Sequence, residues 1–180
     1  MLVIVTSDNN DKALAYLRAH GTDASEAWPD PDHPGELVAP PLTDQTVLCL
    51  LPETGRPVAE QIALGDKILE LGRTRALVLL WTMSRPLFFR LCRRLAEGRF
   101  PYQEMQVVWC GGDEPQIYTF LESGISVGVS PETPMPFLFG EKETDEEYLA
   151  LRQVVHSHLM KDNPIVELRK EYIDMKTGAP

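Results

Sequence analysis

The sequence predicts a Rossmann-like α/β domain with a parallel or mostly parallel sheet of about five strands and helices on both faces. Short, β-branched apolar runs alternate with stretches whose apolar residues recur at helical spacing. The 180 residues are 43% hydrophobic, which is enough to bury one sizeable core. We divide the chain into an α/β domain over residues 1–140 and a C-terminal helical segment over residues 141–180.

The first strands and helices follow each other closely. Residues 2–6 form a buried strand, and the polar residues after it cap a helix that ends at Gly21. The second buried strand covers residues 46–51. Pro57 suits the first position of the next helix, which we expect to end at Gly72.

A long connection separates these two strands. Residues 22–44 are rich in Pro, Asp and Gly, and only residues 35–39 read as a short edge strand. Because so long a structureless connection is unusual in a compact domain, we interpret it as a functional loop or a lid.

The next part of the chain repeats the alternation. Residues 76–81 form the third strand, and Ser84 caps the helix that follows it. The fourth strand covers residues 107–110. We expect a short helix over residues 113–123 and a fifth strand over residues 125–129.

The C-terminal segment is helical. A capping box at residues 144–147 opens a helix whose apolar side includes Tyr148 and Leu151, and Asn163 begins a second helix. We expect this helical hairpin to pack on the domain or on a second copy of the chain, which would make a homodimer.

Charge is distributed unevenly. Residues 1–55 carry two basic and nine acidic side chains, residues 56–99 nine basic and four acidic, and residues 100–180 six basic and fourteen acidic. The net charge of −10 argues against general DNA or RNA binding. The cationic middle either attracts a small anionic ligand or pairs with the acidic ends of the chain.

The expected ligand site lies beyond the carboxyl ends of the strands, where helix N-termini gather in open parallel sheets. The turns there carry hydroxyls, arginines and glycines, a combination that suits a phosphate-bearing ligand, although ordinary helix caps have similar residues. The expected ligand-binding residues are Thr6, Ser7, Asn10, Thr54, Arg56, Ser84, Arg85, Gly111 and Gly112.

Ser84 and Arg85 are the strongest candidates in this set. A hydroxyl, a guanidinium and a helix N-terminus at one turn bind an oxyanion together. Neither the phosphate-loop motif nor the dinucleotide glycine fingerprint is present in the sequence. A P-loop NTPase is therefore disfavoured, and we assign no cofactor.

Glu60, near the start of the second helix, is the one candidate catalytic residue, as a nucleophile or general base toward a nucleoside sugar. The strand, polar turn and Glu-bearing helix over residues 46–80 resemble nucleoside deoxyribosyltransferases. The first strand, which ends in Thr6-Ser7, and residues 47–52 before a helix resemble the small Rossmann-like proteins of type III CRISPR systems. That second resemblance implies binding or cleavage of cyclic oligoadenylates.

Metal and thiol chemistry is not indicated. His156 and His158, two residues apart on a helix, point to different faces, so they do not suit a shared metal. The three cysteines fall in apolar runs and have no paired spacing, which favours the core of a cytoplasmic protein. The start of the chain has no basic segment typical of a secretory signal, and no apolar run is long enough to cross a membrane.

One helix face gathers Arg90, Arg93, Arg94 and Glu97 at helical spacing. This face either binds phosphates or an acidic partner, or contacts the acidic residues 141–147 of the same chain.

Two functions remain open at this point. The first is binding of a nucleotide or nucleotide-derived second messenger at the strand ends, with or without its hydrolysis. The alternative is a non-enzymatic adaptor or inhibitor whose acidic surface or helical hairpin engages a basic protein.

Overall fold

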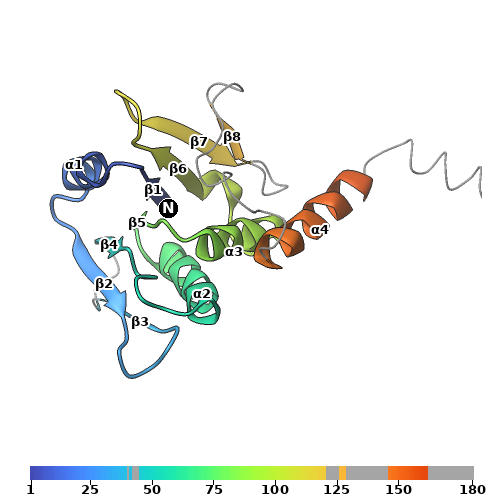
Figure 1. Ribbon diagram of the computed structural model, residues 1–180, viewed down its shortest axis with the longest axis horizontal. Helices are drawn as coiled ribbons and strands as arrows, with labels where there is room; N and C mark the ends of the chain where they lie inside the picture. The colour runs from blue at the N-terminus through green and yellow to red at the C-terminus, as the bar shows by residue number, and fades with distance from the viewer. Residues whose placement is uncertain (40, 42–44, 121–125, 129–145, 162–180) are drawn as a thin grey trace, which may run out of the picture.

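The computed structural model describes residues 1–39, 41, 45–120, 126–128 and 146–161 (Figure 1). Eight strands of one sheet lie in the order β3-β2-β4-β5-β1-β6-β7-β8. The strands are β1 Leu2–Thr6, β2 Ser25–Pro29, β3 Leu37–Val38, β4 Thr46–Leu50, β5 Leu77–Trp81, β6 Met105–Trp109, β7 Gln116–Phe120 and β8 Ser126–Gly128. The helices are α1 Asn10–His20, α2 Val58–Thr74, α3 Arg85–Ala96 and α4 Glu146–Lys161, with a 3₁₀ turn at Tyr102–Glu104.

The centre of the sheet is parallel. Strands β2, β4, β5, β1 and β6 run in one direction, whereas β3 at one edge and β7 and β8 at the other are antiparallel to their neighbours. The prediction of an α/β protein with a mostly parallel sheet is therefore confirmed, and the sheet has more strands than the five expected.

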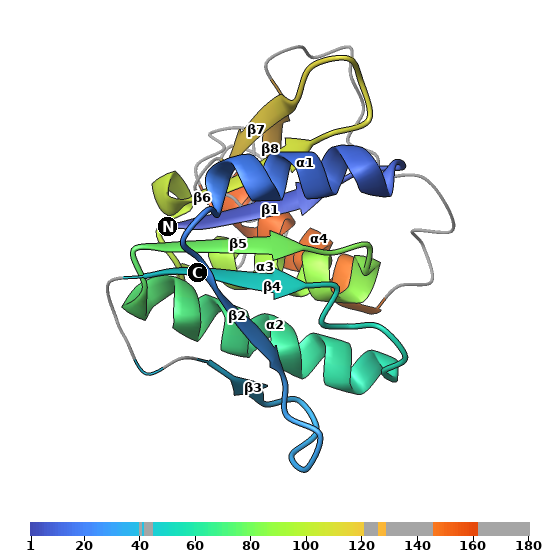
Figure 2. The same cartoon turned by 90° about the vertical axis from the view of Figure 1, so that its left-hand side faces the viewer.

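The two faces of the sheet are covered unequally. Helix α1 lies on one face, over a small core that includes Val5, Leu17 and Trp81. Helices α2, α3 and α4 lie on the opposite face, where the larger core includes Ile4 and Phe88. Figure 2 shows α1 in front of the sheet and α3 and α4 behind it. This division follows from the side-chain alternation along β1, whose successive residues point to opposite faces.

The helix expected at residues 113–123 is wrong, because β7 occupies residues 116–120 and forms an antiparallel hairpin with β6. In β7, Tyr118 and Phe120 are buried while Ile117 is exposed, which is the two-residue period of a strand. Gly111 and Gly112 therefore lie in a hairpin loop and do not lead into a helix. The fifth predicted strand corresponds to β8, which pairs antiparallel with β7.

The long connection 22–44 contains a strand that the sequence reading missed. Strand β2 pairs parallel to β4, but it buries only Ala27 and includes Ser25 and Glu26, so it has no apolar run. Strand β3 confirms the expected edge strand within residues 35–39. The remaining expectation for this segment, a functional loop or lid, has no test among the described residues.

Two boundaries of α2 differ from the prediction. Pro57 is the N-cap of α2 and precedes its first residue, and the helix continues through Gly72 to Thr74. Gly72 is buried inside the helix, because the Phe100 ring packs so closely that an added Cβ would lie 3.0 Å from it. This glycine makes room for a neighbouring ring and does not end the helix.

Helix α4 packs against α3 through Leu151, Tyr148, Val154 and Val155. The first helix of the expected C-terminal hairpin is therefore present. It lies in the helical layer that α2 and α3 form on one face of the sheet. The capping residues 144 and 145, the Pro-rich stretch 131–140 and the second helix of the hairpin lie outside the described residues. Among the helices that the structure describes, none is both long and apolar enough to span a membrane.

Candidate functional site

The topology marks one place at the carboxyl edge of the sheet. Strands β1 and β5 are neighbours, but the turn after β1 leads to α1 on one face and the turn after β5 leads to α3 on the other. Doubly wound sheets bind their ligands at such a switch point, because the diverging turns leave space between them. The turn after β4, which is next to β5, reaches the same place.

Glu53, in the turn after β4, is the polar centre of this region. Its side chain is only 8% exposed. The Oε1 atom accepts hydrogen bonds from the Thr82 hydroxyl at 2.8 Å and from the backbone N–H groups of Met83 and Ser84 at 2.8 and 3.1 Å. A protein carboxylate therefore already occupies the backbone donors that precede α3, where the sequence placed a ligand oxyanion.

The turn that delivers Glu53 has an unusual backbone. Leu51 has a φ of +44°, in the left-handed region that a branched residue rarely adopts. Its N–H donates to the Trp81 carbonyl, and its own carbonyl accepts from the Thr54 N–H. Strain of this kind costs roughly 1–3 kcal/mol and is found preferentially at functional sites.

Among the residues that the structure describes, several polar atoms near the carboxyl ends of β4 and β5 are buried and have no hydrogen-bond partner. They are Glu53 Oε2, the Nε and Nη2 atoms of Arg85, and Trp81 Nε1, which belongs to the core under α1. Arg85 is the first residue of α3, and its guanidinium lies over the Phe89 ring at 6.0 Å. Within the described residues, Glu53 and Arg85 form no ion pair with each other, although Ser84, which binds Glu53, adjoins Arg85.

Ser84 is confirmed as the N-cap of α3. Its hydroxyl accepts the Leu87 N–H at 3.1 Å and donates to Gln61 Oε1 at 2.6 Å. The Gln61 amide in turn donates to the Arg56 carbonyl at 2.7 Å. These bonds connect the starts of α2 and α3, so the Ser84 hydroxyl serves the fold before any ligand is considered.

Thr6 at the end of β1 and Ser7 after it are buried and bonded within the protein. The Thr6 hydroxyl contacts Met83 Sδ at 3.8 Å, across the switch point. The Ser7 hydroxyl donates to the Cys110 carbonyl at 3.0 Å and accepts the Asn9 N–H. Asn9 is the cap of α1, and Asn10 is exposed as the first helical residue.

Thr54, Arg56 and Glu60 lie together at the start of α2. Arg56 pairs with Glu60 at 2.9 Å, and both side chains are partly exposed. Thr54 is exposed in the turn. The predicted catalytic carboxylate of Glu60 is therefore engaged by a cation from its own turn, and its proposed reaction remains a prediction.

Gly111 and Gly112 make contacts within the protein, and their predicted role in ligand binding stays a prediction. Their carbonyls accept hydrogen bonds from the Lys12 ammonium at 3.2 and 2.6 Å. An added Cβ at Gly111 would overlap the Trp109 ring. The side chain that requires this glycine thus belongs to the protein itself.

Substitution of Gly111 by alanine should therefore destabilise the fold. The new methyl group would overlap the Trp109 ring, and relief of such overpacking costs about 1–3 kcal/mol. Gly112→Ala is the matched control, since its Cβ would approach only the Glu114 carbonyl at 3.5 Å. Equal denaturation midpoints for the two variants in urea would contradict the steric explanation.

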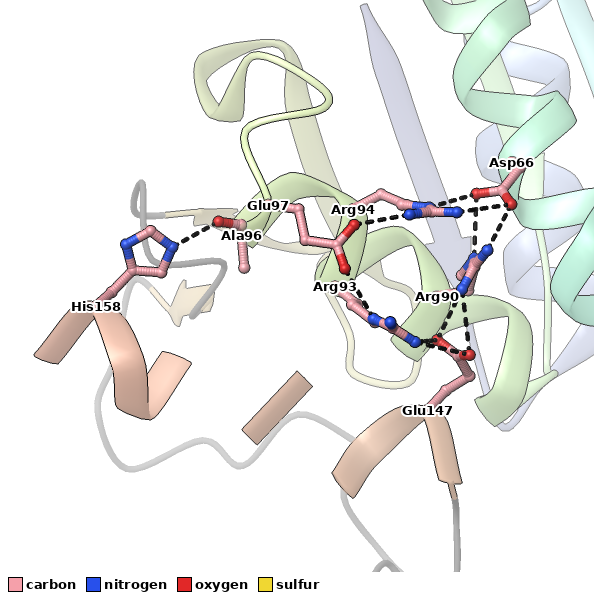
Figure 3. A network of polar contacts seen from close by, with 8 residues as sticks. All are labelled: Asp66, Arg90, Arg93, Arg94, Ala96, Glu97, Glu147 and His158. Atoms are coloured by element: carbon pink, nitrogen blue, oxygen red, sulfur yellow. Dashed lines mark hydrogen bonds and ion pairs between the residues drawn. The ribbon is translucent and has the colours of Figure 1, made fainter. Parts of the chain in front are cut away.

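The arginine-bearing face of α3 makes an ionic network with α2 and α4 (Figure 3). Asp66 bonds to Arg90 at 2.7 Å and to Arg94 at 2.8 Å, and Glu147 of α4 contacts Arg90 and Arg93 at 3.3 and 3.2 Å. The alternative in which this face contacts the acidic residues 141–147 is therefore realised by Glu147. The network therefore links α2, α3 and α4, the three helices that cover the same face of the sheet.

The same contacts set the pKa of the Asp66 carboxyl group. Partial burial acts to raise the pKa of Asp66, but the hydrogen bonds and charges of Arg94 and Arg90 outweigh it and lower the pKa to about 2. The Asp66 carboxylate therefore stays ionised down to strongly acidic pH.

The cysteines are core residues, as predicted. Cys49, Cys92 and Cys110 are all buried as free thiols, and burial raises the pKa of Cys49 to about 12. Thiols of this kind are poor nucleophiles, because little thiolate is present at neutral pH. In the described ranges, no group of three or more His, Cys, Asp and Glu side chains is arranged to hold a metal.

Sequence reasoning missed the residue at the centre of the site. Glu53, Gln61 and Lys12 are not among the ligand-binding residues that the sequence predicts. The sequence does contain a signal for Glu53. A carboxylate three residues after the end of one strand of a parallel sheet lies close to the turn that follows the adjacent strand. What the sequence did not show is that β4 and β5 are adjacent.

Fold and site together define an α/β protein with a mostly parallel sheet. At its carboxyl edge lie a buried carboxylate and an arginine that pairs with no residue the structure describes. Comparison with protein-family models, with curated proteins and with solved structures finds no match for this chain.

Proposed function

We propose that this protein binds a nucleotide, or a messenger derived from one, at the switch point between β1 and β5. The observation that carries the proposal is that two charged groups, one in the turn after β4 and one at the start of α3, have unsatisfied polar atoms: Glu53 Oε2 and the Nε and Nη2 atoms of Arg85. A Rossmann-like mode of binding at the carboxyl edge of the sheet is part of the proposal.

Arg85 is unfavourably placed for stability alone. A cation at the first residue of a helix is repelled by the partial positive charge of the helix N-terminus. Two buried N–H groups without acceptors add a further penalty. An anionic ligand removes both penalties at once, which supports a phosphate group as the partner of Arg85.

Glu53 requires the opposite kind of partner. Its Oε2 atom accepts hydrogen bonds, and a ribose hydroxyl is the donor that acidic residues contact in doubly wound nucleotide sites. A ligand with a sugar hydroxyl and a phosphate carries a partner for each group, and its binding requires these buried atoms to become accessible. Met83, which is 48% exposed and lies beside Thr6, offers a polarisable apolar surface for a base.

The test is calorimetric titration with mononucleotides, dinucleotides and cyclic oligonucleotides. We expect Arg85→Ala to weaken binding of the responding nucleotide by at least about tenfold, since a charge-assisted hydrogen bond contributes about 1.5–3 kcal/mol. The same variant should match or exceed the wild type in stability, because it removes two unsatisfied buried donors. Arg18→Ala, in an exposed position of α1, is the matched control and should bind normally.

Unchanged nucleotide affinity in Arg85→Ala would remove the proposed contact. No response to any nucleotide would favour the alternative function, an adaptor or inhibitor that engages a basic protein through its acidic surface. That function would then be tested by capture of partners with the full chain.

A further inference from the structure

A cavity of about 260 Å³ lies between α2 and α3, away from the site proposed above. Its lining residues are Asp66, Leu69, Glu70, Arg73, Arg94 and Arg99. Arg73 belongs to the last turn of α2, just before β5 begins, and Arg99 follows the end of α3, before β6 begins. The cavity therefore lies toward the amino ends of the parallel strands, whereas Glu53 and Arg85 lie at their carboxyl ends.

The acidic groups of the cavity are already neutralised. Asp66 binds Arg90 and Arg94, and Arg94 also binds Glu97 at 2.8 Å. Figure 3 shows Arg94 between these two carboxylates. Glu70 pairs with Lys67 at 3.3 Å. No carboxylate of the lining thus lacks a cation.

Two cations of the lining are in excess. The side chains of Arg73 and Arg99 make no hydrogen bond or ion pair with any residue that the structure describes, and both are exposed. The α2 C-terminus attracts Arg73 through its partial negative charge, but that attraction does not engage the guanidinium N–H groups. Two guanidinium groups, each with five donors, are therefore available on one concave surface.

We propose that this cavity binds a small phosphate-bearing anion through Arg73 and Arg99. Guanidinium groups match phosphate oxygens two at a time, and a pair of them favours a ligand with more than one negative charge. The volume suits a compact ligand, because sites for larger small molecules begin at about 300 Å³. In the Asp66–Arg94 pair the two charges neutralise each other, so the pair contributes no free charge to the lining.

The test is calorimetric titration of the full-length chain with inorganic pyrophosphate at low ionic strength, with citrate as a comparison polyanion without phosphorus. The variant Arg73→Gln/Arg99→Gln should lose at least about tenfold in pyrophosphate affinity, because each charge-assisted hydrogen bond accounts for about that factor. Affinity should also fall as salt is added, since both side chains are exposed. Arg18→Gln, another exposed arginine, should bind as the wild type does.

Arg85→Ala separates this cavity from the site at the carboxyl edge. Pyrophosphate affinity that persists in Arg85→Ala and is lost in the double variant establishes the cavity as an independent site. Wild-type affinity in the double variant, or no pyrophosphate binding at millimolar concentration, would overturn the proposal. Citrate bound as tightly as pyrophosphate would overturn its restriction to phosphate-bearing ligands.

Discussion

Replacement of Glu53 by alanine should lower the free energy of unfolding by about 3 kcal/mol, because each buried donor left without its acceptor costs about 1–3 kcal/mol. The donors concerned are the Thr82 hydroxyl and the N–H groups of Met83 and Ser84, all of which bind Oε1. Ser84 keeps a second acceptor in the Thr82 hydroxyl at 3.0 Å, which limits the loss. In a chain of this length the melting temperature should fall by about 6–12 °C.

Glu53→Gln is the informative companion. Glutamine retains an oxygen for the same three donors and removes a buried negative charge whose second oxygen has no partner. We expect its stability to stay within about 1 kcal/mol of the wild type, since hydrogen-bonded amides cost less to bury than ions. On the nucleotide proposal, Glu53→Gln should nevertheless weaken nucleotide binding. The substitution removes the negative charge and replaces Oε2, the proposed acceptor for a ribose hydroxyl, by an amide nitrogen. A glutamine variant as unstable as the alanine variant would contradict the hydrogen-bond explanation.

Replacement of Arg90 by alanine should lower the free energy of unfolding by about 2–3 kcal/mol and loosen α4. The Arg90 side chain is 13% exposed and joins Asp66 of α2 to Glu147 of α4. Removal of one partner from a buried pair costs about 3–5 kcal/mol, but partial exposure of Asp66 and its remaining bonds to Arg94 reduce that value. Faster amide hydrogen exchange in α4, measured by mass spectrometry, should accompany the loss.

Arg93→Ala is the control for this experiment. Arg93 is 28% exposed, and Arg90 still contacts Glu147 when Arg93 is absent. Its loss should therefore cost less than about 1 kcal/mol. Equal destabilisation by the two variants would show that the Asp66 contacts of Arg90 do not matter for stability.

Acid titration checks the same network through Asp66. The pKa of Asp66 is lowered to about 2 in the folded protein, against about 3.9 for an unfolded aspartate. The stability that its ionised form contributes is thus fully present above pH 4 and is lost as pH falls from about 4 to 2. The difference in stability between wild type and Asp66→Asn should narrow over that window, by about 1 kcal/mol after allowance for solvent screening.

Strong local patterns made most of the fold predictable. The apolar runs of β1, β4 and β5 and the capped, amphipathic α3 were found with boundaries within one or two residues. The elements that the sequence misses have weak patterns. Strand β2 buries a single residue, and β7 alternates buried with more exposed residues and falls within the stretch where a helix is expected. Strands of this kind, each next to an edge strand, form because their neighbours supply hydrogen bonds, which a local sequence pattern does not record.

The candidate site was likewise predictable only in part. The sequence predicts a site at the carboxyl edge of the sheet with Ser84 and Arg85 in it, because a capping serine after an apolar run is a local signal. It did not reveal that Glu53 occupies the backbone donors of the same turn. Nor did it reveal that Trp109, rather than a ligand, fills the space over Gly111.

By itself, then, the sequence determined the alternation of strands and helices, the mostly parallel sheet and the edge at which polar turns gather. Only the tertiary structure decided which strands are neighbours, with β1 between β5 and β6, and hence which turns meet. The physical reason is that periodicity and capping act over a few residues, whereas a pair such as Glu53 and Ser84 depends on strand order, which the packing of the whole chain sets.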